Sequence, residues 1–336
     1  MPEPLPLRVR LRRVAADLLR QALKVSWDLL KIMVPISIAV RVLQGLGVVA
    51  VLGKLLAPVM SVVGLPGEMG LVWATAMVAN IYGGLVVFAA VAPGLNVTVA
   101  QVSVLATMIL VAHTLPIELR IAQKAGPRLR FMGTLRFGGA LLLGFLLHQV
   151  YSVGGLLQTP ARMLLTPAEE ATWLRWAIGQ GRLIGYIFAV ILALLVLMRL
   201  LKWLGVTGLL CRMLSPVLRL LGMSEQAAPI TIIGMVLGLS FGGGLIIQEA
   251  RSGGLGKRDV FYSLALMGLA HSLIEDTLLM AALGAHWSAT LLGRLVFAVV
   301  VVFLLVKLLS LVSDRTFDRM FFRTARPSPN PTAGVG

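Results

Sequence analysis

Long apolar segments, separated by short polar breaks, restrict the fold of this 336-residue sequence more than any other feature. A helix that crosses a bilayer needs about 20 mostly apolar residues, because the hydrocarbon core is about 30 Å thick. Hydrophobic residues make up 58% of the chain, whereas soluble domains contain about 45–50%. The sequence therefore predicts an all-α polytopic membrane protein. Its expected spans are residues 27–49, 52–65, 69–92, 99–119, 131–155, 180–204, 207–222, 227–249, 260–284 and 288–312.

The two halves of the sequence resemble each other at a constant shift of 158 residues. The matched pairs are His113-Thr114-Leu115 with His271-Ser272-Leu273, Glu118 with Asp276, Pro58 with Pro216, Gly64 with Gly222, and Gly84 with Gly242. One offset that holds over about 60 residues indicates a duplication. The expected segments are a basic amphipathic N-terminal segment (1–26), a first repeat (27–155), a linker (156–179), a second repeat (180–312) and a cytoplasmic tail (313–336).

The basic residues predict how the chain is inserted. The net charge is +16, but lysine and arginine stand in blocks between the apolar segments, which indicates membrane topology and not binding to nucleic acid. The blocks, expected in the cytoplasm, are residues 8–31, 120–136, 199–219, 251–258 and those after 307. The connections 93–98 and 285–288 contain no lysine or arginine, and the linker balances its charges, so these segments should face outward.

Five crossings per half satisfy these assignments. They place both termini in the cytoplasm and give two inverted-topology repeats of about five transmembrane elements each. We expect an integral protein of the bacterial cytoplasmic (inner) membrane.

Glycine-rich sequences interrupt one expected span in each half. Inverted-repeat transporters commonly bind their solute where interrupted helices leave backbone groups free, so one interpretation is a pair of Gly-broken helices that line a solute site. Close helix packing through small residues is the alternative. The candidate solute-binding residues here are Asn80, Gly83, Gly84, Ser240, Gly242, Gly243 and, after the second glycine-rich sequence, Gln248.

Ionisable residues inside apolar spans are costly and are therefore candidates for function. On a continuous helix His271 and Glu275 share a face, so the carboxylate could orient the imidazole or favour its protonated form. His113 occupies the place of His271 in the first half, and Glu118 and Asp276 are the further candidates. A metal site would take His113, His271 and Glu275. Alternatively, each histidine only hydrogen-bonds a neighbouring helix, and each acid only ends a span at the interface.

Several kinds of chemistry are excluded by missing motifs. The sequence contains no GxxxxGK followed by Ser or Thr, which would bind the phosphates of a nucleotide, and no His-Glu-x-x-His of a metalloprotease. Cys211 is the single cysteine, which excludes an intrachain disulfide and a multi-cysteine metal site. We expect a protein that is not an enzyme and that needs no cofactor other than a coupling proton or cation.

At these residues the sequence resembles the nucleoside-recognition, or Gate, domain superfamily. That superfamily includes spore maturation proteins A and B, the membrane part of ferrous-iron permeases and parts of concentrative nucleoside transporters. The likeness covers roughly residues 27–312 and rests on Ala57-Pro58-Val59, Ser215-Pro216-Val217, the glycine-rich sequences, and the His-Thr-Leu and His-Ser-Leu-Ile-Glu-Asp stretches. It implies two Gate-like domains fused into one self-contained unit.

The leading hypothesis is a secondary transporter or permease that moves a small solute or ion by alternating access at the interface between the repeats. Imidazole and carboxylate favour a divalent metal, and the resemblance leaves a nucleoside-like polar solute open. The alternative is a non-transporting membrane interaction module that assembles with envelope partners. The expected partners are the lipid bilayer and the solute. The oligomeric state, homo-oligomers included, is left open.

Overall fold

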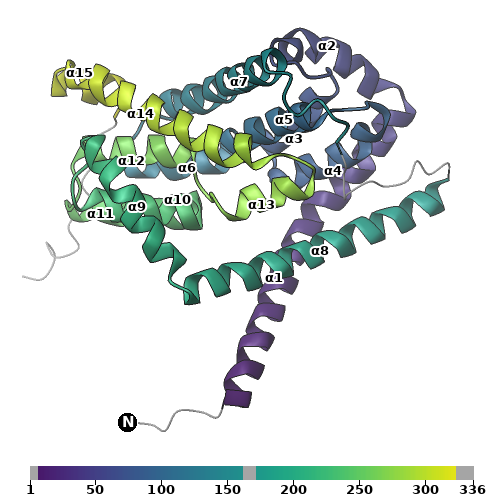
Figure 1. The fold of residues 1–336 in the computed structure, drawn as a ribbon, viewed down its shortest axis with the longest axis horizontal. Helices are drawn as coiled ribbons and strands as arrows, with labels where there is room; N and C mark the ends of the chain where they lie inside the picture. Colours follow the sequence, from purple (N-terminus) through teal and green to yellow (C-terminus); the bar gives the residue numbers. More distant parts are fainter. Residues whose placement is uncertain (1–6, 162–171, 323–336) are drawn as a thin grey trace, which may run out of the picture. The chain divides into compact units, whose positions relative to one another are not determined.

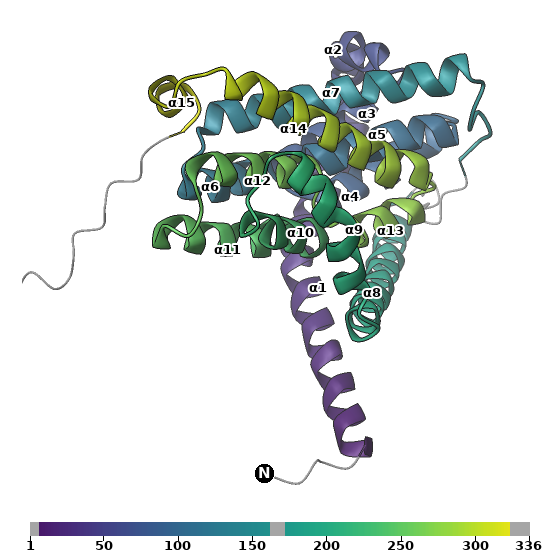
Figure 2. The same ribbon diagram turned by 60° about the vertical axis from the view of Figure 1, so that its left-hand side comes forward.

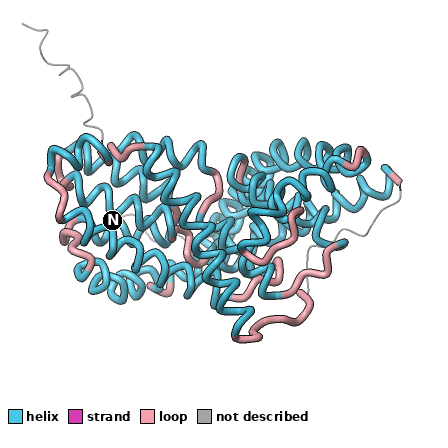
Figure 3. Tube along the Cα trace, turned by 90° about the horizontal axis from the view of Figure 1, so that it is seen from above, coloured by secondary structure: helices cyan, strands magenta, loops and turns pink. Residues whose placement is uncertain are grey.

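Helices make up almost all of the described chain, as the composition predicts (Figure 3). The computed structural model describes residues 7–161 and 172–322, and within these ranges there are two isolated bridges and no strand. The all-α class is therefore confirmed. The elements, labelled in Figure 1, are α1 (Leu7–Gly45), α2 (Val48–Val62), α3 (Met69–Val78), α4 (Ile81–Val91), η1 (Ala92–Gly94), α5 (Val99–Val111), α6 (Leu115–Ala125), α7 (Leu129–Val153), α8 (Trp173–Trp203), α9 (Val206–Leu220), α10 (Ala227–Leu237), α11 (Leu239–Ser252), α12 (Lys257–Leu269), α13 (Glu275–Ala282), η2 (Ser288–Gly293), α14 (Arg294–Ser310) and α15 (Asp314–Met320).

Several helices of the described chain are long and apolar enough to cross a bilayer, which supports an integral membrane protein. By length and composition the four candidates are Val99–Ala125, Leu129–Val153, Trp173–Leu201 and Ser288–Ser310. A fifth candidate is the pair Ala16–Gly45 and Val48–Val62, which is bent by 94°. The bend occurs at Gly47, whose φ of 71° lies in the left-handed region, where glycine has no steric penalty.

Four of the expected spans are divided between two helices, including 99–119, where α5 ends at Val111 and α6 begins at Leu115. Within 69–92, Asn80 is extended and its side chain accepts a hydrogen bond from Gly83 N at 2.8 Å, so it caps the start of α4. Within 227–249 the break lies at Gly238, which has a φ of 98°. Within 260–284 the chain is non-helical from Ala270 to Ile274. Apolar composition alone predicts continuous spans, because hydropathy does not register these changes of backbone direction.

The candidate glycines Gly83, Gly84, Gly242 and Gly243 lie inside helices α4 and α11 and not in the breaks. After each break the chain folds back, so that α3 contacts α4 and α10 contacts α11. A Cβ atom on Gly84 would lie 2.8 Å from the Cβ of Ala76, and one on Gly242 would lie 2.2 Å from the Cα of Gly234. Residues eight positions apart on one straight helix are about 12 Å apart along its axis. The glycines therefore permit close helix packing, as the alternative interpretation predicts.

The 158-residue shift also relates the secondary structure of the two halves. Helix α9 begins and ends 158 residues after α2, and α12 begins and ends 158 residues after α5. Residues with positive φ recur at the same shift, namely Gly47 and Gly205, Gly64 and Gly222, Thr114 and Ser272, and Gly126 and Gly284. The halves therefore share local backbone geometry as well as sequence.

The chain forms two compact units, and each takes residues from both halves of the sequence. Unit 1 comprises Met1–Thr114, Ala140–Leu209 and Leu273–Arg294, and unit 2 comprises Leu115–Gly139, Leu210–Ser272 and Leu295–Gly336. In unit 1, α1 and α8 cross in contact with each other (Figure 1). In unit 2, α11 contacts α6 and α12 (Figure 2).

The unit boundaries differ from the segments expected from the sequence. The expected linker, 156–179, begins and ends inside unit 1. The N-terminal segment 1–26 is not separate from the first span either, because α1 continues through residue 26 to Gly45. In the expected tail, α15 packs through Phe317, which is 1% exposed. Residues 162–171 and 323–336 lie outside the described chain.

Candidate functional site

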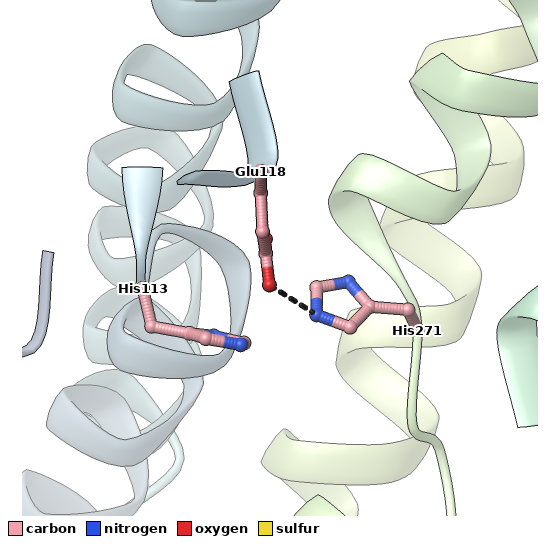
Figure 4. Close-up of side chains that lie close together, drawn as sticks. All are labelled: His113, Glu118 and His271. Carbon is pink, nitrogen blue, oxygen red and sulfur yellow. Dashed lines mark ion pairs between the residues drawn. The ribbon is translucent and has the colours of Figure 1, made fainter. Parts of the chain in front are cut away.

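A buried acid lies at the start of α6. Glu118 is 7% exposed, and its Oε2 accepts a hydrogen bond from Nη1 of Arg136 on α7, which is 2% exposed. Burial of a carboxylate is costly without a partner, and the guanidinium supplies a charged donor. The second oxygen, Oε1, lies 3.4 Å from Nε2 of His271 (Figure 4). We call Glu118, Arg136 and His271 the Glu118 triad, and all three belong to unit 2.

His271 is held in place by the end of α12. The helix ends at Leu269, and the His271 ring is 2% exposed with Nδ1 2.7 Å from the carbonyl oxygen of Met267. A carbonyl oxygen only accepts, so Nδ1 carries a proton and donates it. In the neutral imidazole Nε2 then has a lone pair directed at Glu118 Oε1, which repels it. A proton or a small cation at Nε2 converts this repulsion into attraction.

The predicted helical pair of His271 and Glu275 is wrong. His271 lies outside the helices, and Ser272 has a φ of 48°, so the two residues are not one helical turn apart on a common face. Helix α13 begins only at Glu275. Within unit 2 the carboxylate that faces His271 is Glu118, which comes from the other half of the sequence. The role of Glu275 in binding an ion stays a prediction.

His113 has the same local geometry in unit 1. It follows the end of α5, is 6% exposed, and places Nδ1 3.1 Å from the carbonyl oxygen of Ile109. The next residue, Thr114, has a φ of 50°. Nδ1 of each histidine thus bonds the carbonyl oxygen four residues earlier, on the helix that the histidine follows. The predicted approach of His113 to His271 stays a prediction.

Arg136 is a site residue that was not expected from the sequence, because it belongs to the basic block 120–136 that was assigned to the cytoplasm. The repeat contains a signal for it: the 158-residue shift pairs Arg136 with Arg294, just as it pairs Glu118 with Asp276. In unit 1, Asp276 is 7% exposed and Arg294 is 0% exposed. Each half of the chain therefore contributes one buried acid and one buried arginine at equivalent positions.

Among the candidate solute-binding residues, Asn80 and the glycines have structural roles. Asn80 caps α4, Gly83 and Gly84 are buried in that helix, and a Cβ on Gly83 would lie 2.9 Å from Ile36 Cδ1. Gly242 and Gly243 are buried in α11, where a Cβ on Gly243 would meet Ile121 at 2.6 Å. Gln248 is exposed on the same helix, and Ser240 lies near its start. Their part in solute binding stays a prediction.

Comparison with known proteins gives one family model that matches the N-terminal part of the chain. The family model Gate, described as nucleoside recognition, matches residues 26–126, a stretch that contains His113 and Glu118. An uncharacterized membrane protein of Bacillus subtilis (strain 168), YvoD, is 28% identical over 280 residues, which cover 82% of this chain and 88% of the relative. No solved structure matches the chain. The resemblance found in the sequence is therefore confirmed for residues 26–126, which match the Gate, or nucleoside recognition, model.

Proposed function

We propose that the protein is a secondary transporter, not an enzyme, which moves a small polar solute across the bacterial cytoplasmic membrane and couples this movement to protonation of the Glu118 triad. The observation that carries the proposal is a buried carboxylate with a guanidinium on one oxygen and an imidazole on the other. Ionisable groups at membrane depth commonly mark ion or proton pathways. The Gate domain and the apolar helices support a membrane transport family.

The charge of the triad favours a proton over a divalent metal. With Glu118 ionised and His271 neutral, the charge of Arg136 cancels that of the carboxylate, so a divalent ion finds no net negative charge. Arg136 would also repel such an ion. A proton needs only the Nε2 lone pair of His271, and the resulting imidazolium pairs with Glu118 Oε1.

The proposal includes the architecture expected from the sequence. Two repeats with inverted topology would alternate access to the solute, with both termini in the cytoplasm. The recurrence of helix bounds and positive-φ residues at one shift supports the repeat. The distribution of basic blocks supports the inversion. A homo-oligomer is compatible with this architecture.

A vesicle assay tests the coupling. The purified chain is reconstituted into vesicles that contain a pH-sensitive dye, and uridine, adenosine or Mn²⁺ is added outside. We expect internal pH to change with a nucleoside and not with Mn²⁺. Glu118→Gln should reduce that change about tenfold or more, because it removes the charge that stabilises the imidazolium. Asp318→Asn, which alters an exposed ion pair with Lys257, is the matched control and should behave as wild type.

Three outcomes oppose the proposal. Proton movement driven by Mn²⁺ would favour a divalent metal as the transported solute. Nucleoside uptake that is unchanged in Glu118→Gln would remove the triad from the mechanism. Folded protein that moves none of the three solutes would favour the interaction module.

A further inference from the structure

A polar cavity of about 110 Å³ lies in unit 1 and contains none of the triad residues. It is lined by Val63, Gly64, Thr98, Ala100, Gln101, Val104, His148, Tyr151, Ser152 and Gln158. One water needs about 10–15 Å³ by this measure, so the cavity has room for several waters or a small polar group. None of these ten residues is Lys, Arg, Asp or Glu, which disfavours an ion as the occupant.

The cavity forms where two connections of the chain pair with each other. Val99 N donates to Thr159 O and Ala100 N to Leu157 O, each at 2.9 Å, and Ala161 N donates to Val97 O at the same distance. The connection 93–98 and the start of the linker are therefore held together. Both are expected to face outward from their lack of net positive charge. The cavity thus lies at the predicted outer surface.

Two amide side chains that line the cavity hydrogen-bond to the backbone around it. The Gln101 amide donates to Gly64 O at 3.0 Å and accepts from Thr98 N at 3.1 Å, so both of its ends are used. The Gln158 amide nitrogen donates to the carbonyl oxygens of Tyr151 and Leu156. These bonds fix the loops around the cavity.

Other polar groups of the wall are accessible to a ligand. Ser152 and Gln158 are exposed and His148 is half-buried, so the Ser152 hydroxyl, the His148 ring and Gln158 Oε1 can be reached from the cavity. The hydroxyl and the imidazole can donate to or accept from a neutral hydroxyl, and the amide oxygen can accept from one. Gly64 lets the ring approach, because a Cβ there would lie 2.1 Å from His148 Nδ1.

We infer that this cavity is an outward-facing subsite for a neutral, polyhydroxylated group of the solute. The inference rests on the proposed transport function, since it gives that solute a place of first contact. It also specifies the chemical class of the solute. A site without charged side chains selects hydroxyl groups by hydrogen bonds and leaves cations unbound.

Saturation-transfer NMR of the full chain in lipid nanodiscs tests the inference with D-ribose and glycerol as probes. We expect saturable transfer to ribose in the wild type. Ser152→Ala and His148→Leu should each weaken ribose binding about twofold to tenfold, since each removes a neutral hydrogen bond. Ser61→Ala removes an exposed serine of α2 outside the cavity and should change nothing.

A second pair of variants separates the cavity from backbone strain. Gly64 and Gly222 have φ of 70° and 75°, so an alanine is strained equally at both. Only at Gly64 would the added Cβ displace His148, because at Gly222 the nearest atom is 3.8 Å away. Gly64→Ala should therefore abolish ribose contact, and Gly222→Ala should retain it.

The outcomes distinguish this inference from the proposed function. Glu118→Gln should bind ribose as the wild type does while it loses proton movement. Absence of transfer to ribose in the wild type, as from a cavity that holds only water, would overturn the subsite. Equal transfer in wild type, Ser152→Ala and His148→Leu would overturn it as well, and so would Mn²⁺ broadening of the His148 signals.

Discussion

At the scale of single residues, each carboxylate oxygen of Glu118 has a different partner, a guanidinium at Oε2 and an imidazole at Oε1. Arg136 stays cationic at any physiological pH, so its bond to Oε2 compensates the buried carboxylate at all times. His271 faces Oε1 and changes the charge of the triad when it gains or loses a proton. In the proposed mechanism, one proton on His271 alters the charge of the Glu118 triad while Arg136 still compensates the carboxylate.

The sequence identified two members of the triad and not the third. Glu118 and His271 stand out because acids and histidines are rare in apolar spans. Arg136 does not stand out, because an arginine near the end of a span usually reports topology. Its burial and its bond to Glu118 Oε2 show that it serves the carboxylate. The partner of His271 was also beyond sequence reasoning, since it comes from a residue 153 positions earlier.

Removal of one partner should be far worse than removal of both. Arg136→Met leaves Glu118 buried without its cation, and we expect a loss of about 3–5 kcal/mol in the free energy of unfolding. The double variant Glu118→Met with Arg136→Met should recover most of that loss. Arg130→Met, at an exposed position of the same helix, is the control. Unfolding in one detergent measures all four proteins, and equal losses in the single and double variants would contradict the buried pair.

At the scale of elements, the glycine-rich sequences act through helix packing. α3 and α4, like α10 and α11, fold back across a short break and come close because small residues face each other. From the sequence, a helix break or close helix packing was expected at these stretches in both halves. The sequence could not locate the breaks, because Asn80 stops a helix by capping the next one, and Gly238 stops it by its φ of 98°. Such choices depend on backbone geometry and not on hydrophobicity.

Two glycines of α11 provide a matched test of this packing. A Cβ on Gly242 would lie 2.2 Å from the Cα of Gly234, whereas one on Gly244 would meet nothing within 4 Å. Gly242→Ala should therefore destabilise by about 1–3 kcal/mol through overpacking. Gly244→Ala should be neutral or stabilise by up to about 1 kcal/mol, since alanine favours a helix. Thermal unfolding of both variants checks this, and equal melting temperatures would show that α10 and α11 do not pack closely here.

At the scale of the whole molecule, the two halves of the sequence are not the two units of the structure. Besides 180–209, unit 1 takes 273–294 from the second half, and unit 2 takes 115–139 from the first. These exchanged stretches start at equivalent positions, immediately after Thr114 and Ser272, where φ is positive in both. Repeats found by sequence comparison give the order of the elements along the chain. They do not give the partners of each element, which depend on long-range packing.

Insertion in the membrane is the whole-molecule property that decides between a transporter with inverted repeats and other arrangements. Single cysteines in a Cys211→Ser background report it by reaction with an impermeant maleimide in intact cells. Gly94 and Trp287 belong to the expected outer surface; an added Cβ at Gly94 meets nothing within 4 Å, and Trp287 is 52% exposed. Lys124, exposed near the end of α6, belongs to the expected cytoplasmic surface. Gly94→Cys and Trp287→Cys should react, because their connections lack positive charge, and Lys124→Cys should react only after the cells are permeabilised. Labelling of Lys124→Cys in intact cells would place the loop after Glu118 outside and remove the inversion, since the opposite orientation of the halves depends on that loop being cytoplasmic.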